Sequence, residues 1–358
     1  MYNCDDDVRA YYGDKVQLPD AERTEMRKRR NANRDRLKSG LEKNEDPATL
    51  FEASQGSYAM WTMVQHSEKD YDIDDGVYFS KEDLKGPKGG DKTPADAKEM
   101  VRGAVSTGTL KAEPKVLKNC VRVEYVNDGY HVDLPVYREV KHDENGNELA
   151  EPYYELASSE WKRSDARAVT KWFKDEIKDK SLDDKKAQLR RIVKYVKTFA
   201  RSRNSWRSSI ASGFMISKLV ADHYRGDANR DDSALRETMK AIRDQLDVSL
   251  EIWHPVLAGE KLTKGPDDGR AKFIRERLRE SLEHLAVLDE SDCTRKKALK
   301  TWDKVFATTY FSDRDDGSDG DGSGNGSGGN GSSAKILGSA SAPASAVNRR
   351  GGGRYGLV

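Results

Sequence analysis

The sequence YDIDDGVYF, residues 71–79, sets two carboxylates two positions apart within a stretch of strand-forming residues. Because alternate side chains of a β-strand point to the same side, Asp72 and Asp74 are expected to project together while Ile73 packs into the core. Two negative charges this close repel each other unless a cation lies between them. Magnesium suits the arrangement, since it binds through carboxylate oxygens and substrate phosphates.

Two other interpretations compete for this stretch. Asp70, Asp72 and Asp74 alternate as in a calcium-binding EF-hand loop, but Asp75 stands where that loop needs glycine and Lys81 where it needs glutamate. The second interpretation is an acidic strand end at the protein surface, which this stretch alone does not exclude.

Gln55-Gly56-Ser57 precedes the acidic stretch and opens an apolar pattern of helical spacing over residues 57–66. Glycine permits close approach of the backbone to a ligand, and serine caps helices whose N-terminal N–H groups attract anions. The alternative is an ordinary helix cap, because the dipeptide Gly-Ser is common.

Two apolar runs, CVRVEYV and YHVDLPVYREV, flank residues 127–129 (Asn-Asp-Gly) and predict a β-hairpin with a tight turn. Asp133 is a charge between apolar neighbours in the second run, so it needs a partner or a metal ion. A two-residue turn puts Arg122 on the same face as Asp133. A purely structural Arg–Asp pair is therefore the alternative to metal binding.

The rest of the chain divides in two. Residues 20–45 predict a charged helix that continues towards Gln55, another helix begins near Thr93, and residues 142–148 predict a turn. From about residue 158 the character changes, and residues 164–310 have helical patterns, without a clear strand among them, in residues 167–180, 185–203, 214–224, 233–253 and 271–291. This order predicts an α+β half followed by a helical half. We expect domains at 1–157 and 158–311, a disordered Gly/Ser/Asp linker at 312–334 and a tail at 335–358.

The composition narrows the possible functions. The 358 residues include 63 basic and 62 acidic side chains, so the net charge of +1 gives no reason to expect broad attachment to nucleic acid. No apolar stretch is long enough to span a membrane, and the polar, acidic N-terminus is unlike a secretory signal. Cys4, Cys120 and Cys293 lack zinc-site spacing and are expected to be free thiols in a reducing cytoplasm.

The segments QGSYAMWTMVQ, DYDIDDGVYF and YHVDLPVY resemble, in order and spacing, the bacterial cGAS/DncV-like nucleotidyltransferases (CD-NTases) of anti-phage signalling. This resemblance implies a polymerase-beta-like nucleotidyltransferase domain with a mixed sheet, followed by a helical domain, with the active site in the cleft between two lobes. It also implies a metal-dependent enzyme of the bacterial cytoplasm. Such an enzyme joins ATP and/or GTP into a cyclic di- or trinucleotide, which a separate effector reads.

The resemblance also implies roles for particular residues. Asp72, Asp74 and Asp133 would hold two Mg²⁺ ions, with Mn²⁺ as a substitute, in a two-metal displacement. Gln55, Gly56 and Ser57 would hold the donor nucleotide, and Arg122 would contact phosphate on the acceptor. Lys197 and Ser212 would grip the donor from the helical half, with Lys194 or Ser209 as alternatives.

The end of the chain, NRRGGGRYG, resembles the acceptor tail of type II anti-phage systems. There, E1/E2-like conjugation enzymes attach the C-terminus to other proteins and a protease releases it, which makes Gly356 a candidate linkage residue. The chain departs from this pattern by continuing through Leu357 and Val358. No DNA requirement and no membrane attachment are expected. The alternatives are an enzyme making linear products, as oligoadenylate synthetases and poly(A) polymerases do, or an inactive adaptor with a conjugatable tail.

Overall fold

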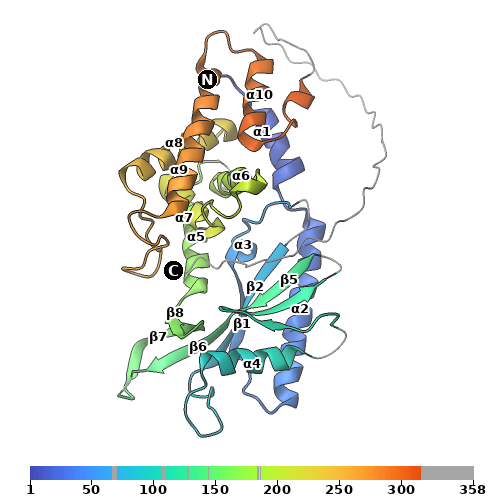
Figure 1. Ribbon diagram of the computed structural model, residues 1–358, viewed down its shortest axis with the longest axis vertical. Helices are drawn as coiled ribbons and strands as arrows, with labels where there is room; N and C mark the ends of the chain where they lie inside the picture. The colour runs from blue at the N-terminus through green and yellow to red at the C-terminus, as the bar shows by residue number, and fades with distance from the viewer. Residues whose placement is uncertain are drawn as a thin grey trace.

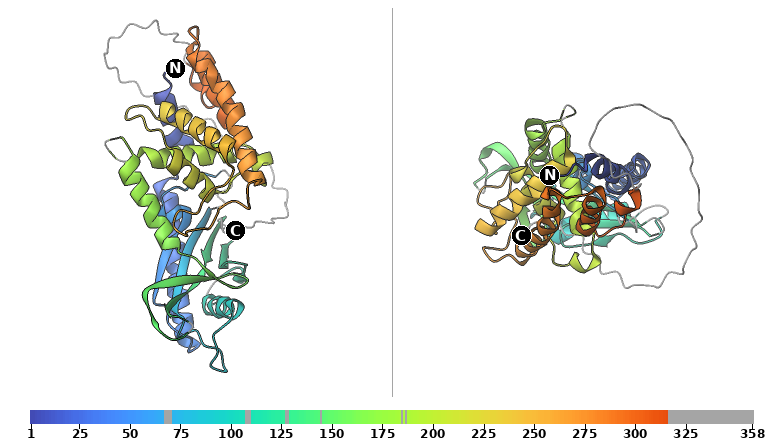
Figure 2. Two further views of the ribbon diagram at one scale, coloured as in Figure 1. Left: turned by 90° about the vertical axis from the view of Figure 1, so that its left-hand side faces the viewer. Right: turned by 90° about the horizontal axis from the view of Figure 1, so that it is seen from above.

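The computed structural model describes residues 1–66, 71–106, 110–126, 129–143, 145–183, 185 and 187–315. Two halves are stacked along the long axis of the molecule: a helical half lies at the top of Figure 1, and a sheet with its covering helices lies below. The side view shows the same stacking, with the long helix α2 running along the lower half (Figure 2). The predicted α+β class is therefore confirmed.

The lower half is built on a mixed eight-stranded sheet. Its strands are β1 (Phe51–Gln55), β2 (Tyr71–Ser80), β3 (Lys115–Val116), β4 (Val121–Tyr125), β5 (Tyr130–Leu134), β6 (Val136–His142), β7 (Glu148–Ala157) and β8 (Trp161–Arg163). β1 lies antiparallel to β2, whereas β5 and β6 both lie parallel to it. Both have the same register, because Tyr71 pairs with Tyr130 and Val77 pairs with Val136. β5 and β6, which are separated by Pro135, thus pair with β2 in one continuous register.

The predicted hairpin is present as β4 and β5, in the register that pairs Arg122 with Asp133. Pairing reaches Tyr125 and Tyr130, and the predicted turn residues Asn127 and Asp128 lie outside the part of the chain described. The second predicted turn joins β6 to β7. The side chain of Asp143 accepts hydrogen bonds there from the backbone N–H groups of Asn145 and Asn147.

One face of the sheet is covered by α2 (Asp20–Lys43) and α4 (Pro94–Val105). Thr93 begins α4 with a capping box, as the Thr-Pro pair predicts. The two helices cross closely at Gly40, where a Cβ atom would lie 1.9 Å from the carbonyl oxygen of Ala104. Only glycine permits that approach, which brings the apolar side chains of both helices onto the sheet.

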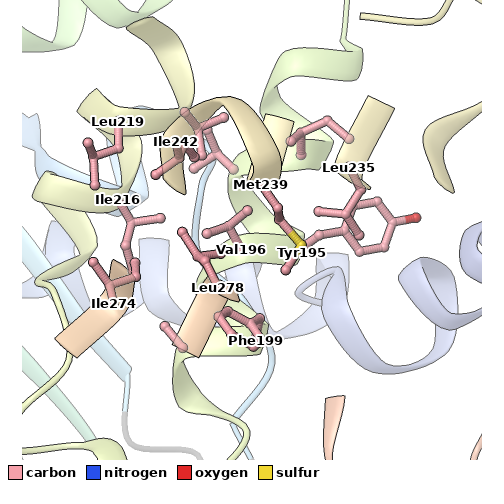
Figure 3. Close-up of a cluster of buried hydrophobic side chains, with 14 of the residues drawn as sticks. Tyr195, Val196, Phe199, Ile216, Leu219, Leu235, Met239, Ile242, Ile274 and Leu278 are labelled. Atoms are coloured by element: carbon pink, nitrogen blue, oxygen red, sulfur yellow. The ribbon is translucent and has the colours of Figure 1, made fainter. Parts of the chain in front are cut away.

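The upper half consists of helices around a second core. Its elements are α1 (Asp5–Tyr11), η1 (Tyr12–Val16), α5 (Ala166–Lys180), α6 (Gln188–Arg201), η2 (Asn204–Trp206), α7 (Gly213–His223), α8 (Asp231–Val248), α9 (Gly269–Leu285), η3 (Ala286–Asp289), α10 (Arg295–Phe306) and η4 (Ser312–Arg314). Side chains from α6, α7, α8 and α9 interdigitate at its centre (Figure 3). The helical patterns of residues 167–291 are confirmed, although α8 ends at Val248.

The structure corrects two predicted helices. The charged helix ends at Lys43, and residues 51–55 form strand β1 instead of continuing it. Residues 57–66 contain only α3 (Gly56–Ala59), because their apolar side chains divide between two cores. Tyr58 and Met63 pack beside the sheet, whereas Met60 and Val64 pack into the helical half. These apolar residues have helical spacing but do not form one helix, because they pack into two separate cores.

The predicted domain boundary also differs from the packing at the N-terminus. Residues 1–157 were expected to form one lobe, but Cys4, Val8, Tyr11 and Val16 are buried in the core of the helical half. The first residues therefore cross from the upper half before α2 reaches the sheet. The predicted disordered linker begins too early, because Ser312–Arg314 forms η4 and the backbone N–H of Ser312 donates to Asp303. Residues 316–358, including Gly356, lie outside the described residues.

Two other expectations concern composition. In the part of the chain that the structure covers, no helix is long and apolar enough to cross a membrane. Cys4, Cys120 and Cys293 are all free thiols, as predicted.

Candidate active site

Strand β2 presents Asp72 and Asp74 on one face, as the alternation predicts. Both are partly exposed, while Ile73 and Asp75 between and after them are buried on the opposite face. The register pairs Asp74 with Asp133 of the neighbouring strand β5. The three carboxylates predicted to act together thus come from adjacent positions of two parallel strands.

Gly56 makes room for Asp74. Its φ angle is +63°, and a Cβ atom at this position would lie 2.4 Å from Oδ2 of Asp74. Any side chain here would collide with the carboxylate and would adopt a left-handed conformation that favours glycine. The glycine therefore allows close approach of the carboxylate of Asp74, and the predicted approach to a ligand remains a prediction.

Asp133 is almost completely buried, and Arg122 is its partner. Nε and Nη2 of Arg122 donate to Oδ1 and Oδ2 of Asp133, both at 2.7 Å. Such bidentate, charge-assisted pairs are among the stronger hydrogen bonds of proteins. Although burial alone lowers it, the pKa of Arg122 is raised above its ordinary value by the hydrogen bond and negative charge of Asp133. The Arg–Asp pair that the hairpin register allows is therefore formed, and metal ligation by Asp133 is untested by it.

This pair affects the expected metal site. Among residues placed by the structure, no group of three or more His, Cys, Asp or Glu side chains is close enough to hold a metal ion. Both oxygens of Asp133 are engaged by Arg122. Asp72 and Asp74 nevertheless fit a hard divalent cation, since their carboxylates share one strand face and are partly exposed. Each oxygen keeps a lone pair beyond the one that accepts from Arg122, so metal ligation by Asp133 remains a prediction.

The residues around Gly56 differ in detail from the prediction. Ser57 is the second residue of the four-residue helix α3 and is not its cap, which is Gln55. The side chain of Gln55 is buried, and its Nε2 donates to the hydroxyl of Tyr137 at 3.2 Å. Its Oε1 has no hydrogen-bond partner among the described atoms and lies against Gly76. Contact of Gln55 or Ser57 with a nucleotide remains a prediction.

Lys197 reaches the sheet half from α6. Its Nζ is buried and donates to Oγ1 of Thr62 at 2.8 Å, just beyond α3. Its side chain also lies beside Gly213, the first residue of α7, whose cap Ser212 accepts from the backbone N–H of Met215. Burial, with the positive charges of Arg201 and Lys194, lowers the pKa of Lys197 to about 7, and Asp72 opposes this shift. Lys197 thus lies beside the start of α7, next to Ser212, and contact of either residue with a donor nucleotide remains a prediction.

The two alternatives are placed elsewhere. Lys194 lies one turn before Lys197 and donates to the hydroxyl of Tyr12 at 3.2 Å. Ser209 lies in the turn before α7, next to Ser208. Sequence reasoning missed Thr62, because the segment around it was assigned to a helix and its polar side chain gave no separate signal.

Sequence and structure comparisons give consistent results. Residues 51–137 match the family model described as "Cyclic GMP-AMP synthase DncV-like, nucleotidyltransferase domain". A Cyclic GMP-AMP synthase of Escherichia albertii is 29% identical over 236 residues, which cover 63% of this chain and 48% of that protein. The chain thus spans about half the length of this curated relative.

Solved structures of similar fold cover most of the chain. E. coli MS115-1 CdnC with ATP has a TM-score of 0.63 and 16% identity, covering 86% of this chain and 98% of CdnC. Vibrio cholerae DncV cyclic AMP-GMP synthase, with the linear intermediate pppA(3′,5′)pG, has a TM-score of 0.61 and 17% identity, covering 82% and 91%. At these identities the likeness concerns the fold, and it confirms the expected nucleotidyltransferase architecture.

Proposed function

We propose that the protein is a metal-dependent nucleotidyltransferase, a proposal supported by the match of residues 51–137 to the DncV-like nucleotidyltransferase domain model. It would join ATP and/or GTP into a cyclic di- or trinucleotide that serves as a second messenger in anti-phage defence. One observation carries the proposal: Asp72 and Asp74 project from one strand face, with Asp133 paired in register beside Asp74. Lys197 supports it by bringing a buried cation from the helical half to the segment that follows α3.

Asp72 and Asp74 would hold a divalent cation such as Mg²⁺, with Mn²⁺ as a substitute. When bound, the cation neutralises phosphate charge and makes the attacking 3′-hydroxyl more acidic. The residues of the protein hold the two carboxylates in position. Gly56 leaves the carboxylate of Asp74 free of steric conflict, and the strand pairing keeps Asp72 and Asp74 on a common face.

Arg122 would orient the carboxylate of Asp133 inside the sheet through two hydrogen bonds. A contact of Arg122 with acceptor phosphate, which the family resemblance implies, requires this pair to loosen. Asp133 would offer a remaining lone pair to the cation or to the hydroxyl proton.

Lys197 would bind the triphosphate of the donor. Its ammonium already donates to Thr62, so a phosphate oxygen would replace or join the threonine hydroxyl. Because its pKa is about 7, an approaching polyanion would favour the protonated form at neutral pH. The adjacent start of α7, capped by Ser212, adds backbone dipoles of favourable sign.

Incubation with labelled nucleotides tests the reaction. The protein is mixed with ATP, GTP, CTP and UTP and Mg²⁺ or Mn²⁺, and the products are then treated with phosphatase. A phosphatase-resistant product supports cyclisation, whereas phosphatase-sensitive ladders indicate linear synthesis. We expect Asp72→Asn combined with Asp74→Asn to lower product formation by about 100-fold or more, because the pair that holds the cation is lost.

Asp179→Asn is the matched control, since Asp179 is exposed on α5 in the other half. It should leave the rate unchanged. Full activity of the double variant would refute the proposed metal site, and absence of any product from the unaltered protein would favour the inactive-adaptor interpretation.

The tail adds a separate proposal. We propose that E1/E2-like enzymes conjugate the chain through its C-terminal region, with Gly356 as the candidate residue, and that a protease reverses the linkage. Gly356 lies outside the described residues, so this rests on sequence resemblance alone. Mass spectrometry of the tail after co-expression with such enzymes tests it, and an intact, unlinked C-terminus would count against it.

A further inference from the structure

A second pocket, of about 250 Å³, lies between the N-terminal segment, the segment after α3 and the first half of α6. Its charged and aromatic lining consists of Tyr12, Asp20, Arg23, Trp61, Arg190, Arg191 and Lys194. Leu18 and Met63, which also line it, pack with Ile73 on the buried face of β2. Asp72 and Asp74 project from the other face, so this pocket is distinct from the candidate active site.

The pocket gathers positive charges that lack acidic partners. Among the residues placed by the structure, no carboxylate forms an ion pair with Arg23, Arg190 or Lys194, and Asp20 is the only acidic residue lining the pocket. The described polar contacts of Arg23 and Lys194 are with Tyr58 O and the Tyr12 hydroxyl. By contrast, Arg191 at the pocket edge is paired with Asp183 and Asp231.

Arg190 adds an unsatisfied donor. Its Nε is buried and has no hydrogen-bond partner among the described atoms. Buried donors are almost always satisfied by protein or by ordered water or ions, and an unsatisfied one costs about 1–3 kcal/mol. Burial, together with the charges of Arg190 and Arg23, lowers the pKa of Lys194 to about 8, although Asp20 opposes this shift. The cluster therefore destabilises the protein when nothing compensates its charge.

Two aromatic rings hold the guanidinium of Arg23. The guanidinium of Arg23 lies 3.5 Å from the ring centroid of Trp61 and 4.1 Å from that of Tyr58. Stacking of this kind holds the guanidinium in one orientation without neutralising it. Trp61 is half exposed and has a φ angle of +59°, an unfavourable backbone conformation that keeps its ring at the pocket.

We propose that this pocket is a binding site for a small phosphate-rich anion, either inorganic triphosphate or the triphosphate group of a nucleotide. Three unpaired cations on two separate elements, α2 and α6, match several phosphate oxygens at once. A volume of about 250 Å³ suits a triphosphate group and is below the range of about 300–1,000 Å³ usual for larger ligands. A base and ribose would therefore remain outside, near Trp61.

Calorimetry in metal-free buffer tests the site. The full chain carrying Asp72→Asn and Asp74→Asn is titrated with sodium triphosphate in the presence of EDTA, which removes the divalent cation on which the candidate active site would depend. We expect one triphosphate per chain, with affinity reduced about tenfold or more by either Arg190→Gln or Lys194→Gln. Lys174→Gln, an exposed lysine on α5, is the matched control and should change nothing.

A parallel titration with ATP separates the two sources of the anion. Equal affinity for ATP and triphosphate assigns the site to nucleotides, whereas ATP binding about tenfold or more weaker assigns it to inorganic triphosphate. Absence of triphosphate binding, or binding that Arg190→Gln and Lys194→Gln both leave unchanged, would overturn the proposal. Neither outcome bears on nucleotidyl transfer, which is measured separately.

Thermal unfolding distinguishes a ligand site from a structural cluster. Without ligand, Arg190→Gln and Lys194→Gln should each raise Tm, because each removes an uncompensated charge. Triphosphate should raise the Tm of the unaltered chain but not of these variants. Lower Tm in both variants, together with a retained response to triphosphate, would show that the cations support the fold instead.

Discussion

At the scale of single residues, the candidate site contains charges that are already paired before any nucleotide is present. Asp133 is held by Arg122, and Lys197 donates to Thr62. Both charged groups are buried, so neither would be stable without such partners. Binding of substrate would therefore add to these contacts or replace them. Where they are replaced, the cost of breaking them becomes part of the affinity for nucleotide.

Gly56 offers a test of the space around Asp74. Gly56→Ala places a methyl group in the carboxylate and keeps an alanine at a positive φ angle. We expect it to destabilise the protein by about 1–3 kcal/mol and to reduce product formation strongly. Urea unfolding and the nucleotide assay measure these effects.

Gly103→Ala is the control, because Gly103 lies in α4 with open space around its Cβ position. It should stabilise the protein by about 0.5–1 kcal/mol and leave activity intact. Similar behaviour of the two variants would contradict the role given to Gly56.

Lys197 predicts a particular pH dependence of stability. Folding lowers its pKa from 10.5 to about 7, mainly through burial. Between these values the unfolded chain carries a proton that the folded chain lacks, so this residue makes the free energy of unfolding rise with pH. Its destabilising effect is complete below pH 7 and fades towards pH 10.5. Relative to Lys197→Met, the unaltered protein should gain up to about 1.4 kcal/mol per pH unit across this window.

Urea unfolding at pH 7, 8 and 9 measures that difference. Lys174→Met, which changes an exposed lysine, should differ from the unaltered protein by a constant amount. A flat difference for Lys197→Met would contradict a depressed pKa at this residue.

At the scale of secondary-structure elements, α2 is tied to the strand that carries the acidic residues. Nε and Nη2 of Arg34 donate to the two carboxylate oxygens of Asp75, each at 2.6 Å, and the hydroxyl of Ser54 donates to Oδ1. Asp75 is fully buried, directly after Asp74. This contact fixes the rotation of β2 relative to the helix, which sends the side chains of Asp72 and Asp74 to the opposite face.

Substitution of Arg34 should show how much this contact contributes to the free energy of unfolding. Arg34→Met leaves the carboxylate of Asp75 buried with Ser54 alone, and we expect a loss of about 3–5 kcal/mol in urea unfolding. Arg34→Met combined with Asp75→Asn should recover part of that loss, because the isolated charge is gone. Arg27→Met, at an exposed position of the same helix, should change stability by less than about 0.5 kcal/mol.

At the scale of the whole molecule, the N-terminus belongs to the far half of the structure. Tyr11 of α1 is buried against Phe306, Tyr310 and Phe311, with ring centroids between 4.7 and 5.2 Å away. The chain then returns to the sheet as α2. Residues from both ends of the chain thus close the helical core.

Tyr11→Ala should therefore destabilise the helical half more than the sheet half. We expect a loss of about 3–5 kcal/mol in the free energy of unfolding, as for other large buried aromatic residues. Hydrogen exchange should increase first in α10 and less in α4. Trp253→Ala, at a half-exposed position, is the control and should cost much less. Faster exchange confined to α4 would contradict the packing of α1 on the helical half.

Local patterns in the sequence were sufficient for the strand that carries Asp72 and Asp74, the hairpin register of Arg122 and Asp133, and the helices after residue 158. Each depends on spacing within a single element or one turn, where side-chain direction follows from backbone geometry. The helix predicted over residues 57–66 failed because its apolar side chains serve two cores, a division that spacing cannot reveal.

Contacts between distant segments depended on tertiary structure alone. The burial of Gln55, the bond from Lys197 to Thr62 and the packing of α1 each require knowing which surfaces meet. The same holds for the cation cluster of Arg23, Arg190 and Lys194. Alternation within YDIDDGVYF is sufficient to identify the acidic residues. Their surroundings depend on how the two halves fold together, because burial and charge pairing arise from long-range packing.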